Sequence, residues 1–183
     1  MKLNEKEISG LWVAETCHYI DHRGAFSRLY CENELSEILG RRRIMQINHS
    51  RTLMAGAVRG MHYQNPPHAE MKLVRCMKGR VWDVALDLRR NSPTFLMWHA
   101  EELSPGNGRV MIIPEGCAHG FQVLEQDSEL LYFHTSAYTP GAEGGVSYAD
   151  PLIDIKWPLP PSDLSARDLN HSPITLDFRG IQL

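Results

Sequence analysis

The feature that most constrains the fold is a succession of short apolar strands separated by glycine and proline turns. Between residues 58 and 138, segments rich in Val, Ile, Leu and aromatic residues alternate with turn residues at 78–79, 91–94 and 104–108. Many short strands at regular spacing, with turns of this kind, are typical of a β-sandwich or a β-barrel. We therefore expect an all-β fold.

The length and composition fit one globular domain. The chain has 183 residues, of which 43% are hydrophobic and 22% are charged, and this is enough to bury a core. No fixed-period repeat and no linker is visible, so we expect a single domain over residues 1–183. Short peripheral helices are expected at 33–40, which opens on an Asn and closes on a Gly, and at 163–169.

Charge and targeting signals exclude several classes of protein. The net charge is −3 and the pI is about 6.3, which argue against a nucleic-acid or anionic-membrane partner. The N-terminus lacks the apolar region of a signal peptide, and no apolar run reaches transmembrane length. The four cysteines have no CxxC spacing and are interpreted as free thiols. We expect a cytoplasmic protein.

Residues 59–75 combine strand-forming and charged side chains. The segment holds two arginines, a lysine, two histidines and a glutamine, and Pro66 and Pro67 divide it into two strands, which we expect to form a hairpin. Charged groups in a strand must face water or line a cavity, because burying them unpaired is costly. We interpret His62 and Lys72 as the working groups of such a cavity.

A second pattern narrows the fold to a jelly roll. Gly108, Pro114, Gly116 and His119 fit the G-x5-P-x-G-x2-H half-motif of cupins, which points an imidazole into the barrel. We therefore expect a cupin-type double-stranded β-helix. A metal-binding cupin also needs a His-x-His pair and a nearby Glu, since several ligands must converge. The equivalent place reads His-Tyr-Gln from residue 62, so we expect no metal site.

Motifs spread over most of the chain resemble one family. In order from about residue 21 to residue 168, the sequence is similar to the dTDP-4-dehydrorhamnose 3,5-epimerase family. The resemblance implies a cupin-type jelly roll that forms a homodimer and acts, without metal or organic cofactor, on a nucleotide-diphosphate 4-keto-6-deoxyhexose. The motifs that carry it are residues 59–64, 72–75, 83–89, 92–95, 113–121, 138–140, 150–151 and 164–168.

The resemblance also implies roles for individual residues. His62 corresponds to the general base, Asp168 to the carboxylate that orients it, Tyr132 to the general acid and Lys72 to the group near the developing enolate oxygen. The positions that hold the nucleotide-sugar correspond to Arg23, Gln46, Asn48, Arg59, His119, Tyr138, Glu143 and Arg167. His68, His99 and His134 are interpreted as structural.

The chemistry explains why these residue types are needed. A C4 ketone acidifies the hydrogens on C3 and C5, and returning a proton to the other face inverts the carbon. An imidazole has a pKa near the working pH, a carboxylate fixes its tautomer, and a phenol is a neutral acid at pH 7. A fixed positive group near the enolate oxygen is worth about 3 kcal/mol in a water-poor site.

Three departures from the family pattern are visible. Arg28 stands where thymidine-specific members usually have Glu, Glu70 where many have Gln, and Arg167 where Lys is usual. A guanidinium donates to the acceptors of cytosine, so Arg28 is a candidate base-binding residue and CDP, then GDP, are alternatives to dTDP. The sequence leaves open whether C3, C5 or both are inverted.

Two other functions remain open from the sequence. One is a metal-dependent cupin, either an isomerase or a dioxygenase. The other is a non-catalytic cupin that binds a nucleotide-sugar without turnover, although binding alone does not need a base and an acid. The leading prediction is an epimerase of deoxysugar biosynthesis that supplies a surface polysaccharide such as an O-antigen.

Overall fold

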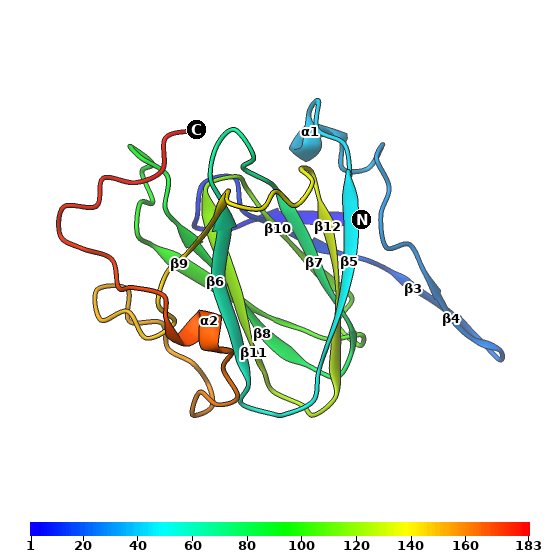
Figure 1. The fold of residues 1–183 in the computed structure, drawn as a ribbon. Helices are drawn as coiled ribbons and strands as arrows, with labels where there is room; N and C mark the ends of the chain where they lie inside the picture. The colour runs from blue at the N-terminus through cyan, green and yellow to red at the C-terminus, as the bar shows by residue number, and fades with distance from the viewer.

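The computed structural model describes residues 1–183 as two facing antiparallel sheets with a projecting two-stranded arm (Figure 1). Thirteen strands and two four-residue helices make up the regular structure. They are β1 Lys2–Glu5, β2 Trp12–Glu15, β3 His18–Asp21, β4 Gly24–Ser27, α1 Ser36–Leu39, β5 Gln46–Thr52, β6 Val58–Gln64, β7 Lys72–Lys78, β8 Val81–Asp87, β9 Trp98–Leu103, β10 Arg109–Ile113, β11 Cys117–Val123, β12 Ser128–His134, β13 Glu143–Gly145 and α2 Ala166–Leu169.

The two sheets confirm the expected all-β, jelly-roll class. One sheet has the order β1-β2-β10-β7-β12-β5 and the other has the order β13-β6-β11-β8-β9. From β5 to β8, and again from β9 to β13, each strand lies in the opposite sheet from the strand before it. Strands distant in sequence therefore become neighbours, and the side chains of both inner faces meet in one interior.

The expected hairpin between residues 59 and 75 is wrong. β6 pairs with β11 and β13, whereas β7 pairs with β10 and β12 in the other sheet. β11 and β12, on either side of residues 126–127, likewise belong to different sheets. As a result, β6 and β7 direct side chains into the space between the sheets from opposite sides.

Strand alternation sorts the core into three layers. Val74, Met111, Phe121 and Leu130 pack between the sheets. The outer face of the five-stranded sheet is covered by the C-terminal tail, which crosses it as irregular chain (Figure 1). The outer face of the six-stranded sheet packs against α1.

The helices are short, as expected, and α1 is shorter than the segment that the sequence predicts. α1 covers only residues 36–39 of the expected 33–40, and it ends at Gly40, which has a φ of 59°. Asn33 does not cap it, because its backbone carbonyl accepts from Ser36 while Leu35 holds the cap position. α2 falls within the expected 163–169, and the Ser165 hydroxyl caps it by accepting from the backbone N–H of Asp168.

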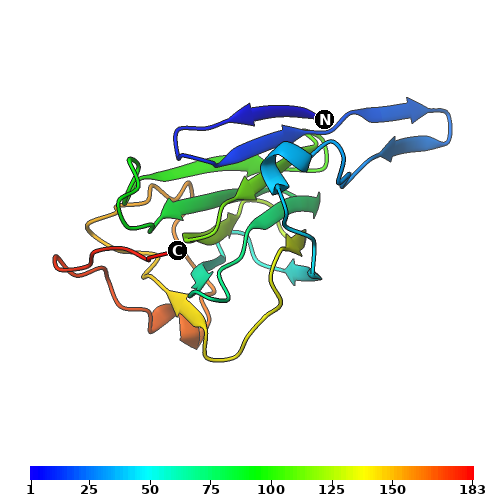
Figure 2. The same cartoon turned by 90° about the horizontal axis from the view of Figure 1, so that it is seen from above.

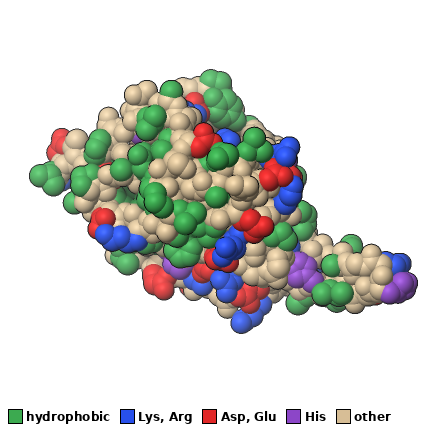
Figure 3. All heavy atoms as spheres, turned by 90° about the horizontal axis from the view of Figure 1, so that it is seen from below, with side chains coloured by type: hydrophobic (Ala, Val, Ile, Leu, Met, Phe, Trp, Pro, Cys, Tyr) green, Lys and Arg blue, Asp and Glu red, His purple; other side chains and the backbone are tan.

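The arm formed by β3 and β4 stands clear of the body (Figures 2 and 3). Its apolar side chains have no cover within the protomer, since Tyr19, Ile20 and Phe26 are 69%, 79% and 70% exposed. The arm is connected to the body through β2 and the segment that leads to α1. No helix has the length and apolarity that crossing a membrane would require.

Candidate active site

A cavity of about 840 Å³ opens between the two sheets. The five-stranded sheet contributes two histidines to one wall. The six-stranded sheet contributes a lysine, a tyrosine and two more histidines to the other, and the segment around α2 lies at the mouth. The polar residues that line it are Asn48, His49, Ser50, Arg59, His62, Lys72, His119, Tyr132, His134, Asp163, Ser165, Arg167 and Asp168.

Two glycines allow β6 and β11 to approach closely beside the histidines. Gly60 has a φ of 131°, and a Cβ there would lie 2.5 Å from the Cα of Gly120. The register between the strands shifts at this point, and it places His62 directly opposite His119. The tight crossing therefore fixes two imidazoles as neighbours on one wall.

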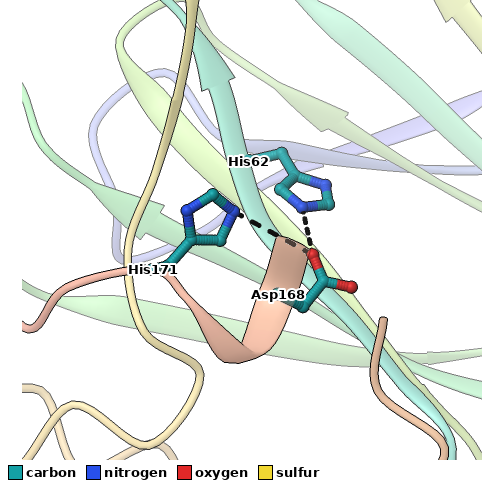
Figure 4. A group of neighbouring side chains, drawn as sticks. All are labelled: His62, Asp168 and His171. Atoms are coloured by element: carbon teal, nitrogen blue, oxygen red, sulfur yellow. Dashed lines mark hydrogen bonds and ion pairs between the residues drawn. The ribbon is translucent and has the colours of Figure 1, made fainter. Parts of the chain in front are cut away.

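His62 forms a hydrogen-bonded pair with a carboxylate that arrives from the far end of the chain. Its Nε2 lies 2.6 Å from Oδ1 of Asp168, which α2 holds in a buried position (Figure 4). Since an ionised carboxylate only accepts, His62 donates from Nε2 and keeps the lone pair on Nδ1. Burial lowers the pKa of His62 to about 4, against the opposing effect of Asp168. His62 is therefore a neutral base at pH 7.

Tyr132 lies on the opposite wall as a neutral phenol. Its hydroxyl is 2.9 Å from the Ser50 hydroxyl on β5, and its ring meets that of His119 edge to face at 6.0 Å. Burial is the main cause that raises the pKa of Tyr132 well above its usual range. The residue is thus an acid that keeps its proton until a strong base forms nearby.

Lys72 supplies a fixed cation between the two walls. Its Nζ donates to the backbone carbonyl of His62 at 3.2 Å and pairs with Oε1 of Glu70 at 3.2 Å. The side chain is almost fully buried. Because these two acceptors fix the position of the ammonium group, the direction of its third N–H bond is set by the protein and not by solvent.

A second carboxylate–imidazole pair stands beside the first. Nε2 of His119 lies 2.7 Å from Oδ1 of Asp83, which is fully buried on β8. Burial raises the pKa of Asp83, and the imidazole opposes this shift. His119 is therefore fixed in orientation, with its ring against the cavity.

Six other predicted binding residues divide between the lining and the rim. Asn48, Arg59 and Arg167 line the cavity. Gln46 donates to Oδ1 of Asn48 at 3.1 Å, and its own side-chain oxygen accepts from the backbone of Tyr138. Glu143 connects two residues of the rim. It forms an ion pair with Arg167 at 2.7 Å and accepts a hydrogen bond from the Tyr138 hydroxyl at 3.1 Å.

Two predicted binding residues lie away from the cavity of their own protomer. Arg23 is at the tip of the arm, where it pairs with Asp21 at 2.6 Å. Arg28 follows β4 and forms an exposed ion pair with Glu34. Neither lines the cavity, so their roles in binding stay predictions.

The structure adds residues that the sequence did not single out. His134 was interpreted as structural, but it lines the cavity, two positions after Tyr132 on the same face of β12. The alternation of the strand was the signal that would have found it. Ser50 and His171 reach the site through partners distant in sequence, and no local pattern marks them.

His171 raises the question of a metal. The ligand atoms of His62, Asp168 and His171 all lie within 4.8 Å of one another, so the group could hold an ion (Figure 4). However, His62 Nε2 and Asp168 Oδ1 lie 2.6 Å apart and are joined by a hydrogen bond. An ion bound to both atoms at about 2.0 Å would replace this hydrogen and push the two atoms further apart. Lys72 and Arg167 also act on this site as repelling cations. The geometry suits proton transfer better than metal binding.

Comparison with known proteins identifies the family of the chain. The family model described as dTDP-4-dehydrorhamnose 3,5-epimerase matches residues 5–175. A protein of that name from Shigella flexneri is 40% identical over 171 residues, which cover 93% of this chain and 94% of that protein. A dTDP-4-dehydrorhamnose 3-epimerase from Streptomyces niveus is 36% identical over 169 residues, or 92% of this chain and 81% of that protein.

A solved structure with a bound sugar nucleotide is similar as well. The crystal structure of dTDP-6-deoxy-D-glucose-3,5-epimerase from Legionella pneumophila, in complex with dTDP-4-keto-L-rhamnose, superposes with a TM-score of 0.90 at 37% sequence identity. The match covers 96% of this chain and 94% of that chain. Fold and sequence similarity therefore extend over nearly the whole molecule.

Proposed function

Because the chain belongs to the dTDP-4-dehydrorhamnose 3,5-epimerase family, we propose that it inverts C3, C5 or both in a dTDP-linked 4-keto-6-deoxyhexose. The observation that carries the proposal is the pairing of His62 with Asp168 at 2.6 Å across the cavity from Tyr132. A neutral base and a neutral acid on facing walls suit an inversion through an enolate. The names of the relatives favour dTDP over CDP as the first nucleotide to test.

The first step is proton abstraction. Nδ1 of His62 takes the hydrogen from the carbon next to the C4 ketone, and the electron pair of that C–H bond moves to form an enolate. Asp168 stabilises the imidazolium that results, since it accepts the Nε2 hydrogen throughout. Lys72 stands near His62 and stabilises the negative charge on the enolate oxygen.

The second step returns a proton from the other side. Tyr132 gives its phenolic hydrogen to the opposite face of the same carbon, and the carbonyl re-forms. The Ser50 hydroxyl, 2.9 Å away, donates to the phenolate that remains. Each inversion leaves an imidazolium and a phenolate, and exchange with solvent restores both groups. The mechanism draws every group from the chain itself, and we propose no cofactor.

Arginines at the mouth suit the diphosphate of the nucleotide. Arg59 lines the cavity, where its Nε donates to the Thr52 hydroxyl at 2.9 Å and leaves its two terminal nitrogens free for a ligand. Arg167 lies on α2 beside Asp168. Guanidinium groups bind phosphate oxygens in a bidentate manner, so the two arginines place the nucleotide outside and the sugar inside.

We further propose a homodimer in which the arm of one protomer contacts the other. Two surfaces support it: the exposed apolar arm, and β5, an edge strand of the six-stranded sheet that carries the exposed Ile47. Such an arrangement would also bring Arg23 and Arg28 to the cavity of the partner. Analytical ultracentrifugation tests the homodimer, since Phe26→Glu should yield monomers and a monomeric wild type would refute it.

A cytoplasmic location suits a nucleotide-sugar substrate.

A metal-dependent reaction is the second candidate, and the cluster of His62, Asp168 and His171 is the observation that favours it. Metal analysis of the purified protein separates the two candidates. The epimerase proposal expects full activity after dialysis against a chelator. Stoichiometric Fe, Zn or Mn, together with activity lost to the chelator and restored by the metal, would support the alternative.

The test of the proposed function is solvent exchange. We would incubate the protein in D2O with dTDP-4-keto-6-deoxyglucose and, separately, with its CDP counterpart, and follow the sugar by NMR. The expected result is deuterium at C3, C5 or both in the dTDP-sugar, and the labelled position identifies the carbon. A preference for the CDP-sugar would assign base recognition to Arg28. Absence of exchange in both sugars would refute the epimerase.

A further inference from the structure

A series of hydrogen bonds runs along the cavity wall formed by the six-stranded sheet, from Tyr138 at the rim to a buried carboxylate. The backbone N–H of Tyr138 lies 3.0 Å from Oε1 of Gln46, and Nε2 of Gln46 lies 3.1 Å from Oδ1 of Asn48. Nδ2 of Asn48 is 3.4 Å from Nε2 of His134, and Nδ1 of His134 is 2.8 Å from Oε2 of Glu70. These contacts form one continuous hydrogen-bond series, and it ends at the carboxylate of Glu70, which is only 8% exposed.

The two ends of the hydrogen-bond series fix the direction of every bond between them. The backbone N–H of Tyr138 can only donate, and an ionised carboxylate can only accept. Burial alone would raise the pKa of Glu70, but the hydrogen bond from His134 and the charge of Lys72 outweigh burial and hold this pKa below its usual value. Each amide accepts on one side and donates on the other, so turning either amide around would bring two donors or two acceptors face to face.

The same argument gives the state of the His134 imidazole. Nδ1 donates to Glu70 and Nε2 accepts from Asn48, so the ring is neutral and carries its hydrogen on Nδ1. Both ring nitrogens are then committed to partners within the protein. Although His134 lines the cavity, it has no nitrogen left to bind a ligand, and its effect on a ligand passes through Asn48.

The sheet register holds these side chains in place. Gln46 and Asn48 on β5 pair with His134 and Tyr132 on β12, so all four side chains project from one face. Each side chain of β12 meets the next residue on that face of β5, since His134 contacts Asn48 and Tyr132 contacts Ser50. Asn48 is therefore held on both sides of its amide, and one of the two hydrogens on Nδ2 is left without a partner.

We propose that His134 is a positioning residue for Asn48, which contacts the nucleotide-sugar as a hydrogen-bond donor. Nδ2 of Asn48 faces His134, which lines the cavity, whereas Oδ1 faces Gln46, which does not. The amide therefore offers the cavity a donor, and it selects an acceptor oxygen of the sugar or of the diphosphate. Glu70 fixes the tautomer of His134 that this orientation requires. The inference rests on the proposed function, because it needs a nucleotide-sugar in the cavity.

A double-mutant cycle separates positioning from simple packing. His134→Leu and Asn48→Ala should each lower kcat/KM by about tenfold, mainly through KM, as loss of one neutral hydrogen bond does. If His134 acts through Asn48, the double variant should also lose about tenfold, and not the hundredfold of two independent effects. In all three variants kcat should change by less than about threefold, since Glu70 keeps its 3.2 Å ion pair with Lys72.

A conservative variant and a matched control sharpen the cycle. His134→Gln extends a side-chain oxygen to the position of Nε2, where it can accept from Asn48, so kcat/KM should stay within about threefold of wild type. His68→Leu is the control, because His68 contacts Thr139 at 3.2 Å and lies outside the lining. It should change kcat/KM by less than about threefold in the wild type and in Asn48→Ala alike.

Calorimetry with dTDP identifies the oxygen that Asn48 binds. If the acceptor belongs to the diphosphate, the Kd of dTDP should rise in His134→Leu by about the factor seen in KM. If the acceptor belongs to the sugar, this Kd should be unchanged while KM still rises. Both results support the positioning role, and they divide its two ligand sources.

The outcomes are distinguishable from failure of the proposed function. A wild type that exchanges no deuterium refutes the function itself. An active wild type in which the losses of His134→Leu and Asn48→Ala multiply, or in which His134→Gln is no better than His134→Leu, overturns the inference and leaves the function intact. Thermal unfolding of each variant is measured alongside. If His134→Leu unfolds early, His134→Asn replaces it in the cycle with the same expected result, because it keeps a donor for Glu70 but has no atom at the Nε2 position.

Discussion

Replacing Asp168 with asparagine tests the base most sharply, because it changes one charge and almost no volume. In the wild type the buried carboxylate accepts the Nε2 hydrogen of His62 at 2.6 Å. An amide in its place offers either a neutral acceptor or a donor. As a donor, it would turn the imidazole to the tautomer that carries its hydrogen on Nδ1, and a base in that form cannot take a proton from carbon.

The expected loss follows from the contact itself. A hydrogen bond to a charged group contributes about 1.5–3 kcal/mol, which corresponds to about 10- to 150-fold in rate if it is realised in the transition state. The tautomer effect adds to this loss, since a comparable Asp→Asn change beside a catalytic histidine costs about 10⁴-fold. We therefore expect kcat to fall by about 100- to 10,000-fold, with little change in KM, because Asp168 is buried behind the base.

The pH profile gives a second readout with a definite sign. Burial holds the pKa of His62 at about 4, and Asp168 acts to raise it. Wild-type kcat/KM should thus stay flat from about pH 8 to about pH 5 and fall only as pH drops through the pKa of His62. Removing the carboxylate should move this acid limb to still lower pH.

Deuterium wash-in, measured by NMR from pH 4 to 8, is the assay for both effects. Asp163→Asn is the matched control, since Asp163 also lines the cavity but accepts no hydrogen bond from an imidazole. It should retain activity within about threefold, as surface changes away from a special contact usually do. Activity of Asp168→Asn within tenfold of wild type, or an acid limb displaced to higher pH, would refute the role assigned to the pair.

Three further predictions test the charge, the packing and the stability of the molecule. Lys72→Met should lower kcat by about 10²- to 10³-fold in the exchange assay, as loss of an oxyanion stabiliser does, and near-normal turnover would contradict its role. Gly60→Ala should destabilise the fold by about 3 kcal/mol or more, since its Cβ would meet Gly120 at 2.5 Å, and an unchanged urea midpoint would contradict the close crossing. The pKa of Glu101 falls to about 2, because hydrogen bonds and charge from His99, Lys6 and Arg109 outweigh the effect of burial. Below about pH 4.5 the folded state therefore binds fewer protons than the unfolded chain. The stability that Glu101 contributes should be lost as pH falls from 4.5 toward 2. In thermal melts, the melting temperature of Glu101→Gln should fall less on acidification than that of the wild type.

The sequence predicted the class of the fold but not the pairing of its strands. Apolar alternation and turn residues locate β6, β7 and β8 closely, because these signals are local. Whether a strand pairs with its neighbour or crosses to the other sheet depends on distant partners, and a turn at residues 65–71 looks the same in both cases. The expected hairpin failed on this point, and the jelly roll placed His62 and Lys72 on facing walls instead.

In the candidate site, too, local patterns predict some residues, while contacts between distant segments decide the others. A local motif predicts His119, and the alternation of the strand places His134 on the same face as Tyr132. His62 and Asp168 are 106 positions apart and meet only because the tail returns over the sheet to place α2 at the cavity. No spacing rule predicts such a contact, so only the family resemblance indicated it. The bridge that Glu70 makes between Lys72 and His134 needed the side-chain positions themselves.

The central claim is that the base and the acid act on opposite faces of one carbon. The measurement that tests it most directly is the stereochemistry of deuterium incorporation in Tyr132→Phe. With His62 intact and the phenol removed, the enolate should still form and should be quenched from the side of His62, so the sugar should gain deuterium but keep its starting configuration. An inverted sugar formed by Tyr132→Phe at a rate near wild type would contradict the account.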